Sequence, residues 1–342
     1  MPTHKKTPRP VKKKREKSGI PASGSAAAAK SPSHADCVIF DMDNVLIDTR
    51  KSYLAAIRHT VDIYLTEGQV PYFKNDTGRK KAGIVSANDV HQFKLLGGFN
   101  DDWDCCYALL IYLTSLPVKP NFVSSLKKNI DIKSFAAGIR ERPLRVNGIV
   151  EKLGRPSTVT IEKIARIFQE IYLGKELFKL VEHKRNMYWK KRGLILQEKP
   201  IFRKSTLEKL KQKGVKLAVA TGRPRFEALF ALRHFGLTAL FDAVTAMDEV
   251  KQAEAQQKVS LRKPHPFSIL RTAEKIGSHL SFFYVGDLPD DILAANQAKE
   301  HIRIKSVAFP SYHDNPAQAL KEMERVNPDL ILKKPSDLTA LV

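Results

Sequence analysis

The chain has 342 residues, with 58 Lys and Arg against 36 Asp and Glu, a hydrophobic fraction of 43% and three cysteines. This length suggests about two domains of ~150 residues each, with enough apolar material for a substantial core. Three cysteines, two of them adjacent (Cys105 and Cys106), exclude a secreted disulfide framework and favour a reducing, intracellular compartment. The longest apolar run, residues 105–113, is about half the ~20 residues that cross a bilayer, so we expect no membrane span.

The net charge of +22 is concentrated in two parts of the chain, residues 1–36 and residues 51–200. The first part is rich in Lys, Pro, Ser and Ala and too poor in large apolar side chains to offset chain entropy, which predicts a disordered basic tail. Within this tail, residues 10–17 resemble a nuclear-import signal or an arm for nucleic acid or acidic lipid. The alternative is a solvated basic leader without a receptor. The expected compartment is therefore the cytoplasm or the nucleus.

The first expected strand, residues 37–40, is a short apolar run that ends abruptly in Asp41-Met42-Asp43. The ~160 residues between this strand and the next predict helices and not strands. Apolar side chains stand at the three- and four-residue spacing of helices in residues 52–65, 157–173 and 176–189. We predict a separate all-helical domain over residues 51–199, with a return linker near Pro200.

Two motifs inside this helical domain each have two interpretations. Residues 100–104 predict a helix start, with Asn100 as the N-cap and acids in the first turn. The same residues, led by Gly97-Gly98, could also reach a substrate. Residues 185–192 interleave aromatic and basic side chains, as nucleic-acid surfaces often do. A helix with an apolar stripe and a solvated basic face explains this second motif as well, and we favour it.

Two later apolar runs have the design of the first. Residues 216–220 end in Thr221-Gly222-Arg223-Pro224, and residues 281–285 end in Gly286-Asp287. Residues 302–308 and 329–332 are further strand candidates. Strands that alternate with helices predict an α/β fold, a Rossmann-like doubly wound parallel sheet whose chemistry lies at the carboxyl ends of the strands.

The residues at these strand ends are suited to phosphate chemistry. Asp41 and Asp43 suit either a hard cation such as Mg²⁺ or a nucleophile with an acid/base partner. Thr221 and Gly222 offer a hydroxyl and an unhindered backbone N–H, and Pro224 suits the first position of a helix, which together make an anion cradle.

Two further motifs complete this set. Lys263, between prolines in Lys263-Pro264-His265-Pro266, supplies a fixed cation. Asp287, Asp290 and Asp291 add carboxylates at another strand end. A hydroxyl, a lysine and two strand-end acid clusters predict a phosphoryl-transfer site with a divalent metal.

Four motifs, VIFDMDNVL, VATG, KPHP and VGDLPDD, stand in this order along the chain. On these motifs the chain resembles the haloacid dehalogenase superfamily of hydrolases, and in particular its phosphoglycolate-phosphatase-like members. The resemblance covers residues 37–50 and 200–342 as the catalytic core. It implies that residues 51–199 are a cap domain inserted after the first motif, longer than the usual one.

The resemblance also implies a catalytic role for four residues. Asp41 resembles the nucleophile that becomes an aspartyl phosphate, and Asp43 resembles the general acid that protonates the leaving alcohol and then activates water. Thr221 is expected to bind the phosphoryl oxygens, and Lys263 to neutralise developing charge. A carboxylate at Asp43 disfavours the dehalogenating and phosphonate-cleaving branches, which lack it.

The remaining site residues are expected to bind phosphate or metal. Gly222 and Arg223 complete the expected phosphate site. The resemblance implies that Asp41, the backbone carbonyl of Asp43 and Asp287 hold Mg²⁺. Asp291 is then either an outer ligand or the residue that orients Lys263. One position departs from the pattern, since Asn44 stands where many relatives have Gly. A short side chain tolerates such a turn, and we expect little effect on activity.

The predicted function is that of a Mg²⁺-dependent phosphatase that hydrolyses a small phosphate monoester. One alternative is a phosphomutase that returns the phosphoryl group from the same aspartyl phosphate to its substrate. The other is a non-catalytic module that binds nucleic acid through its basic tail and cap, which the intact motif residues do not favour. We expect no membrane partner. Neither the leaving group nor the oligomeric state can be read from the sequence.

Overall fold

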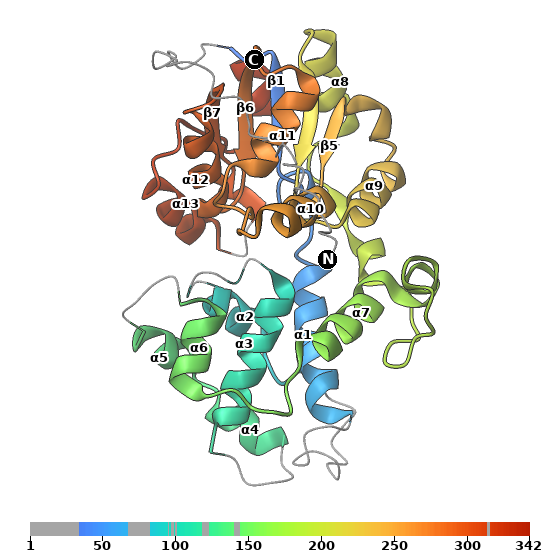
Figure 1. Ribbon diagram of the computed structural model, residues 1–342, viewed down its shortest axis with the longest axis vertical. Helices are drawn as coiled ribbons and strands as arrows, with labels where there is room; N and C mark the ends of the chain where they lie inside the picture. The colour runs from blue at the N-terminus through green and yellow to red at the C-terminus, as the bar shows by residue number, and fades with distance from the viewer. Residues whose placement is uncertain are drawn as a thin grey trace, which may run out of the picture.

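The computed structural model describes residues 34–67, 83–94, 96, 99, 101–117, 123–139, 144–312 and 315–342. In Figure 1 these residues form two lobes, an α/β core and a helical lobe. The basic run at residues 10–17 and the lead-in residues Gly97, Gly98 and Asn100 lie outside the described part of the chain.

The core is built on a six-stranded sheet in the order β5-β4-β1-β6-β7-β8, in which every pairing is parallel. The strands are β1 (Cys37–Phe40), β4 (Lys216–Ala220), β5 (Ala243–Thr245), β6 (Ser281–Gly286), β7 (Arg303–Ala308) and β8 (Leu330–Ile331). The predicted fold class is therefore confirmed. The sequence reading missed β5, because three residues are too few to show a strand pattern.

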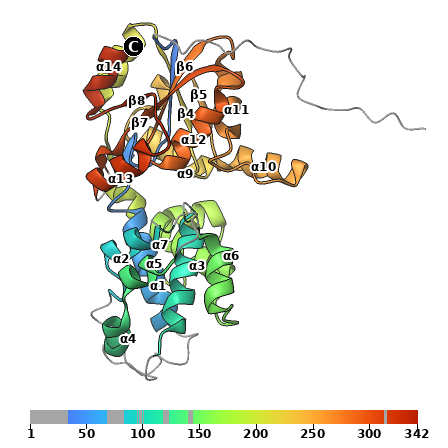
Figure 2. The ribbon, with the colours of Figure 1, turned by 90° about the vertical axis from the view of Figure 1, so that its left-hand side faces the viewer.

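Helices cover both faces of this sheet. The helices of the core are α8 (Lys204–Gln212), α9 (Arg225–His234), α10 (Met247–Gln257), α11 (Phe267–Ile276), α12 (Pro289–Ala298), α13 (Pro316–Glu324) and α14 (Leu338–Leu341). Apolar side chains of α8, α9 and α14 pack against one face, and those of α11 and α12 against the other. Figure 2 shows α11 and α14 on opposite sides of the sheet. None of the helices in the described ranges combines the length and the apolar character needed to cross a bilayer.

Among the described residues, the backbone passes between the core and the helical lobe at one place. Strand β2 (Ile47–Asp48) leaves the core, β3 (Lys199–Pro200) returns to it, and the two pair antiparallel with Ile47 opposite Pro200. Between them lie α1 (Tyr53–Thr66), α2 (Ala87–Lys94), α3 (Asp102–Ser115), α4 (Val123–Asn129), α5 (Ile132–Ala137), α6 (Arg145–Leu153) and α7 (Ile161–Glu182). A two-stranded ribbon at the only described crossing is a natural hinge.

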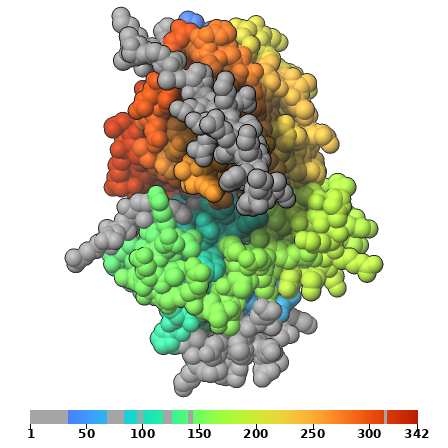
Figure 3. Space-filling view, viewed as in Figure 1, coloured from blue at the N-terminus to red at the C-terminus, as the bar shows by residue number. Residues whose placement is uncertain are grey.

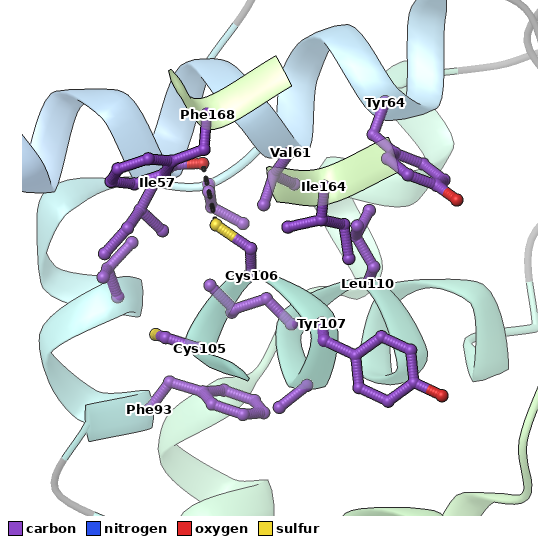
Figure 4. Close-up of a cluster of buried hydrophobic side chains, with 14 of the residues drawn as sticks. Ile57, Val61, Tyr64, Phe93, Cys105, Cys106, Tyr107, Leu110, Ile164 and Phe168 are labelled. Atoms are coloured by element: carbon purple, nitrogen blue, oxygen red, sulfur yellow. Dashed lines mark hydrogen bonds between the residues drawn. The ribbon is translucent and has the colours of Figure 1, made fainter. Parts of the chain in front are cut away.

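The helical lobe has its own apolar core, formed mainly between α1, α3 and α7. Figure 4 shows Cys105 and Cys106 among its side chains, with the Cys106 thiol 4.0 Å from the Ile57 carbonyl oxygen. All three cysteines are buried free thiols, and burial raises the pKa of Cys105 to about 12. These thiols therefore act as small apolar side chains, since the reactive thiolate form is suppressed.

Helix α3 begins where the sequence predicted, with a different capping residue. The carboxylate of Asp101 accepts the backbone N–H groups of Trp103 and Asp104 at 2.9 and 3.4 Å, which makes Asp101 the N-cap. Asp102 and Asp104 lie in the first turn, where negative charge offsets the positive end of the helix dipole.

The predicted helix over residues 176–189 is wrong in its second half. Helix α7 is kinked at Gly174 (φ +72°) and ends at Glu182, where His183 takes a left-handed conformation (φ +53°). A Cβ atom on Gly174 would lie 2.0 Å from the Gly193 nitrogen, so the close approach of these two segments requires glycine.

Residues 185–192 consequently form a loop, and the favoured interpretation of this motif as a helix with an apolar stripe is wrong. The buried carboxylate of Glu170 accepts the backbone N–H groups of Met187, Tyr188 and Trp189 at 2.7–3.1 Å. Its other oxygen is paired with Arg166 at 2.6 Å. One buried anion thus fixes the loop, because charge-assisted hydrogen bonds are stronger than those that a continued helix would offer.

Candidate active site

Three predicted site residues follow three adjacent strands. Asp41 comes after β1, Thr221 after β4 and Asp287 after β6, and β1 pairs with both β4 and β6. The carboxyl ends of parallel strands meet at one edge of a sheet, so these side chains gather there. In Figure 1 this edge of the core faces the helical lobe.

Asp41 lies at the centre of the site, buried and in contact with Lys263. The Lys263 Nζ atom lies 2.5 Å from Asp41 Oδ1 and 2.7 Å from Asp291 Oδ1. The second Asp41 oxygen accepts the backbone N–H of Asp43 at 3.0 Å. Burial raises the pKa of Asp41 well above its usual range, and Lys263 opposes this shift only in part. The lysine thus stabilises a carboxylate that is otherwise costly to keep ionised.

Asp291 orients Lys263 and is held from three sides. Its Oδ1 atom accepts the Tyr284 hydroxyl at 3.0 Å in addition to Lys263, and its Oδ2 atom accepts the backbone N–H groups of Asp287 and Leu288 at 3.2 and 3.1 Å. The backbone at Gly286 passes so close to Asp291 that a Cβ atom on Gly286 would lie 2.2 Å from the Asp291 Cβ. A glycine before Asp287 is therefore required by packing.

The same edge of the sheet has the composition of a site for a hard divalent cation. One carboxylate oxygen from each of Asp41, Asp287 and Asp291 can be chosen so that all three lie within 4.8 Å of one another, and the three residues are buried. Among the described residues, Lys263 is the cation in contact with Asp41 and Asp291. Three buried carboxylates gathered beside one lysine offer the oxygen ligands that Mg²⁺ prefers.

Asp43 does not place its carboxylate in this cluster. Its Oδ1 atom accepts Arg223 Nε at 2.6 Å and Nη2 at 2.5 Å. The Arg223 guanidinium is fully buried and also pairs with Glu198, through Nη1 at 3.0 Å and Nη2 at 3.2 Å. The sequence led us to expect Arg223 at a phosphate. The structure places it between two carboxylates, which occupy all three of its nitrogen atoms.

The other residues of the expected phosphate cradle lie beside Arg223. The Thr221 side chain is buried, and its hydroxyl accepts the backbone N–H of Arg223 at 3.1 Å. Gly222 is exposed, and a Cβ atom there would come no closer than 3.9 Å to the Met247 side chain, so sterics do not require glycine. Asn44 takes φ +53°, a left-handed conformation that glycine adopts without strain and that a short asparagine side chain tolerates.

The helical lobe contacts the active-site edge through the start of α3. Asp101 pairs with Arg262, the residue before Lys263, at 3.1 Å, and the Lys251 ammonium lies 5.6 Å from the centre of the Trp103 ring. Figure 3 shows the green helical lobe in contact with the yellow-to-red core across the middle of the molecule. Asp101, the second residue of the expected substrate-contacting segment 100–104, thus binds the core.

The sequence reading missed Glu198, Tyr53 and Tyr172, which surround Arg223. Glu198 is buried just before β3, and it accepts hydrogen bonds from the Ser52 hydroxyl at 2.8 Å and the Tyr172 hydroxyl at 2.9 Å. The Tyr53 ring stacks on Tyr172 with 4.6 Å between centroids, and the Arg223 guanidinium lies 5.2 Å from the Tyr53 ring centre. No local pattern marks these residues, since they come from three separate segments.

Fold and site together define a Rossmann-like hydrolase with an inserted helical lobe. One family model, haloacid dehalogenase-like hydrolase, matches residues 35–299. The match covers most of the chain, and the chain belongs to this family.

Curated relatives match over shorter stretches. A phosphoglycolate phosphatase of Pasteurella multocida is 38% identical over 96 residues, which are 28% of this chain and 39% of that protein. Pyrophosphatase PpaX of Bacillus pumilus is 30% identical over 139 residues, 40% of this chain and 56% of that protein. The chain thus spans about half the length of these relatives or less.

Solved structures support the fold over nearly the whole chain. Phosphatase Tt82 from Thermococcus thioreducens superposes with a TM-score of 0.56 at 22% identity, covering 84% of this chain and 98% of that one. A predicted phosphoglycolate phosphatase from Haemophilus somnus superposes with a TM-score of 0.52 at 18% identity, covering 90% and 97%. At these identities the similarity is one of fold.

Proposed function

We propose that this protein is a Mg²⁺-dependent phosphatase that hydrolyses a small phosphate monoester through an aspartyl phosphate on Asp41. The observation that carries the proposal is the arrangement of Asp41, which is buried, 2.5 Å from the Lys263 ammonium, and grouped with two further buried carboxylates. Family membership and the phosphatase names of the relatives support the same reaction class.

In the first step an Asp41 oxygen attacks phosphorus, and the bond from phosphorus to the ester oxygen breaks. Asp43 gives its proton to the departing oxygen, so that an alcohol leaves. In the second step a water molecule loses a proton to Asp43 and attacks phosphorus, the bond to Asp41 breaks, and inorganic phosphate is released. Asp41 and Asp43 thereby return to their starting states.

The surrounding residues stabilise the charge of the phosphoryl group and hold the reacting groups in position. Lys263 faces the charge that develops on the phosphoryl oxygens, while Asp291 holds the lysine in place. The Thr221 hydroxyl and the backbone at Gly222 are proposed to bind the phosphoryl group. Asp41, Asp287 and the backbone carbonyl of Asp43 would hold the metal, with Asp291 beside them. A bound Mg²⁺ would offset the negative charge of the carboxylates and of the phosphate.

The substrate is proposed to be small, because residues 51–199 are proposed to act as a cap, and Asp101 of the helical lobe pairs with Arg262 next to Lys263. A phosphomutase would use the same nucleophile, and the fate of the phosphoryl group separates the two activities. Release as inorganic phosphate indicates a phosphatase, and recovery in an isomeric ester indicates a mutase.

The test is phosphate release from a panel of small phosphate esters, with Mg²⁺ and with EDTA, for wild-type protein and for the Asp41→Asn and Asp43→Asn variants. We expect turnover that requires metal and is abolished by Asp41→Asn, and trapping of ³²P on the wild-type chain under acid quench. Asp242→Asn, which alters an exposed carboxylate paired with Lys211, is the control. Turnover that survives Asp41→Asn would disprove the assignment of Asp41 as the nucleophile.

A further inference from the structure

The Asp43 carboxylate is connected to the hinge of the helical lobe by an unbroken series of polar contacts. Arg223 donates to Asp43 and to Glu198, at distances from 2.5 to 3.2 Å. Glu198 in turn accepts the hydroxyls of Ser52 and Tyr172. Glu198 immediately precedes β3, whereas Ser52 and Tyr172 belong to the entrance and the last long helix of the helical lobe.

The three charged side chains in this series of contacts, Asp43, Arg223 and Glu198, differ in their access to water. The side chains of Arg223 and Glu198 are 0% and 1% exposed, while Asp43 is 33% exposed, so only the Asp43 end is open to the site. A buried guanidinium needs its carboxylate partners, because an unpaired buried charge costs several kcal/mol. Arg223 therefore cannot move away from Glu198 without a large penalty, and its position fixes that of Asp43.

The aromatic residues of the helical lobe complete the enclosure of Arg223. Tyr53 lies under the guanidinium and stacks on Tyr172, and its hydroxyl donates to Glu227 of α9 at 3.2 Å. A rotation of the helical lobe about the β2–β3 ribbon would displace Tyr53, Tyr172 and Ser52 relative to Arg223. Such a rotation would break the hydrogen bonds that hold Glu198.

We propose that Arg223 and Glu198 are positioning residues that couple the closed state of the helical lobe to the placement of the general acid, Asp43. With the lobe closed, Ser52 and Tyr172 hold Glu198, Glu198 holds Arg223, and Arg223 holds the Asp43 carboxylate at the active-site edge. With the lobe open, Asp43 loses this support, so that leaving-group protonation is efficient only when the site is closed. The inference rests on the proposed phosphatase function.

A series of aryl phosphates of similar size tests this coupling. A good leaving group such as 4-nitrophenolate departs without a proton, whereas 4-methylphenolate needs one, and kcat/KM reports the step in which the leaving group departs. Arg223→Lys and Glu198→Gln are expected to lower kcat/KM for 4-methylphenyl phosphate by on the order of 10²-fold, and for 4-nitrophenyl phosphate by only about threefold. A merely structural defect would lower both rates alike.

Two kinds of variant keep the test informative where a charge change unfolds the protein. Tyr172→Phe and Ser52→Ala each remove one hydroxyl from Glu198 and touch neither Asp43 nor the substrate site. We expect each to show a smaller loss with the same dependence on the leaving group. Arg225→Met is the matched control, because it removes an exposed guanidinium two residues away that pairs with Glu249.

A double-mutant comparison measures the connection itself. If Tyr172 acts through Glu198, adding Tyr172→Phe to Glu198→Gln should cause no further loss. Additive losses, or equal losses on both esters, would overturn the coupling. Asp43→Asn is the reference: if it shows no dependence on the leaving group, or if wild-type protein shows no turnover, then the proposed function itself fails.

Discussion

Replacing Asp287 by asparagine should make the metal-free protein more stable and remove its response to Mg²⁺. An oxygen of Asp287 can lie within 4.8 Å of oxygens of both Asp41 and Asp291, in a buried site. At this distance and an effective dielectric constant of ~20, two like charges repel by about 3 kcal/mol. Lys263 offsets part of this repulsion. We therefore expect Asp287→Asn to stabilise the protein in EDTA by about 2 kcal/mol, a rise in melting temperature of roughly 4 °C.

The response to metal should change in the opposite direction. A ligand that binds only the folded state adds ~2.7 kcal/mol at a concentration of 100 Kd, so wild-type protein should melt at a higher temperature in millimolar Mg²⁺. Asp287→Asn should lose most of that increase and release little phosphate. Asp290→Asn, which changes a neighbouring acid outside the three-carboxylate cluster, is the control.

Thermal melting followed by circular dichroism, with and without Mg²⁺, tests both expectations for Asp287→Asn. If Asp287→Asn melts at or below the wild-type temperature in EDTA, the charges at this edge are not in the repulsive arrangement inferred here. A full Mg²⁺ response in the variant would place the metal elsewhere.

Three further changes test other parts of the molecule. Gly286→Ala should destabilise the core by about 2 kcal/mol and reduce phosphate release, since its Cβ would lie 2.2 Å from Asp291, whereas Gly138→Ala, with its nearest neighbour at 3.4 Å, should be nearly neutral to melting and activity. Burial raises the pKa of Glu227 to about 7, so the folded state favours the protonated carboxyl and loses stability as pH rises from about 4.5 through 7. Urea unfolding should therefore show Glu227→Gln to be more stable than wild type by about 3 kcal/mol above pH 8 and equal to it below pH 4.5; a constant difference at all pH values would contradict the assignment. Glu170→Ala should free the loop at residues 185–192 and speed tryptic cleavage there without loss of turnover, and unchanged cleavage would show that the loop has other supports.

The strand-end residues could be predicted because their signal is local. A short apolar run followed by polar residues indicates a buried strand that reaches an active-site edge, and Asp41, Thr221 and Asp287 all lie where this pattern placed them. The parallel pairing of β1 with β4 and β6 then follows from strand and helix alternation. Side-chain chemistry and chain order were sufficient for this part of the site.

The ion pairs of Arg223 could not be predicted from its sequence neighbours. Its sequence neighbours, Thr221 and Gly222, suggested a phosphate ligand, but the direction of a long side chain depends on charges elsewhere in the fold. Glu198, which immediately precedes the return strand, attracts the guanidinium into the interior. The conformation of the loop at residues 185–192 could not be predicted either, because it is determined by Glu170, a residue 17 positions earlier.

The position of β1 in the sheet also has a consequence for how the chain folds. β1 is made first and lies at the centre of the sheet, yet its partners are residues 216–219 and 282–285. The helical lobe is complete before either partner leaves the ribosome, and although α1 packs most extensively on the distant α7, its individual helices can form locally and faster than long-range strand pairings. The strands of the core pair over long sequence separations, so the sheet cannot form until residues 216–219 and 282–285 have been synthesised. Refolding should thus proceed in two phases, a rapid gain of helix in the inserted lobe and a slower closure of the sheet, during which the edges of β1 are exposed to aggregation.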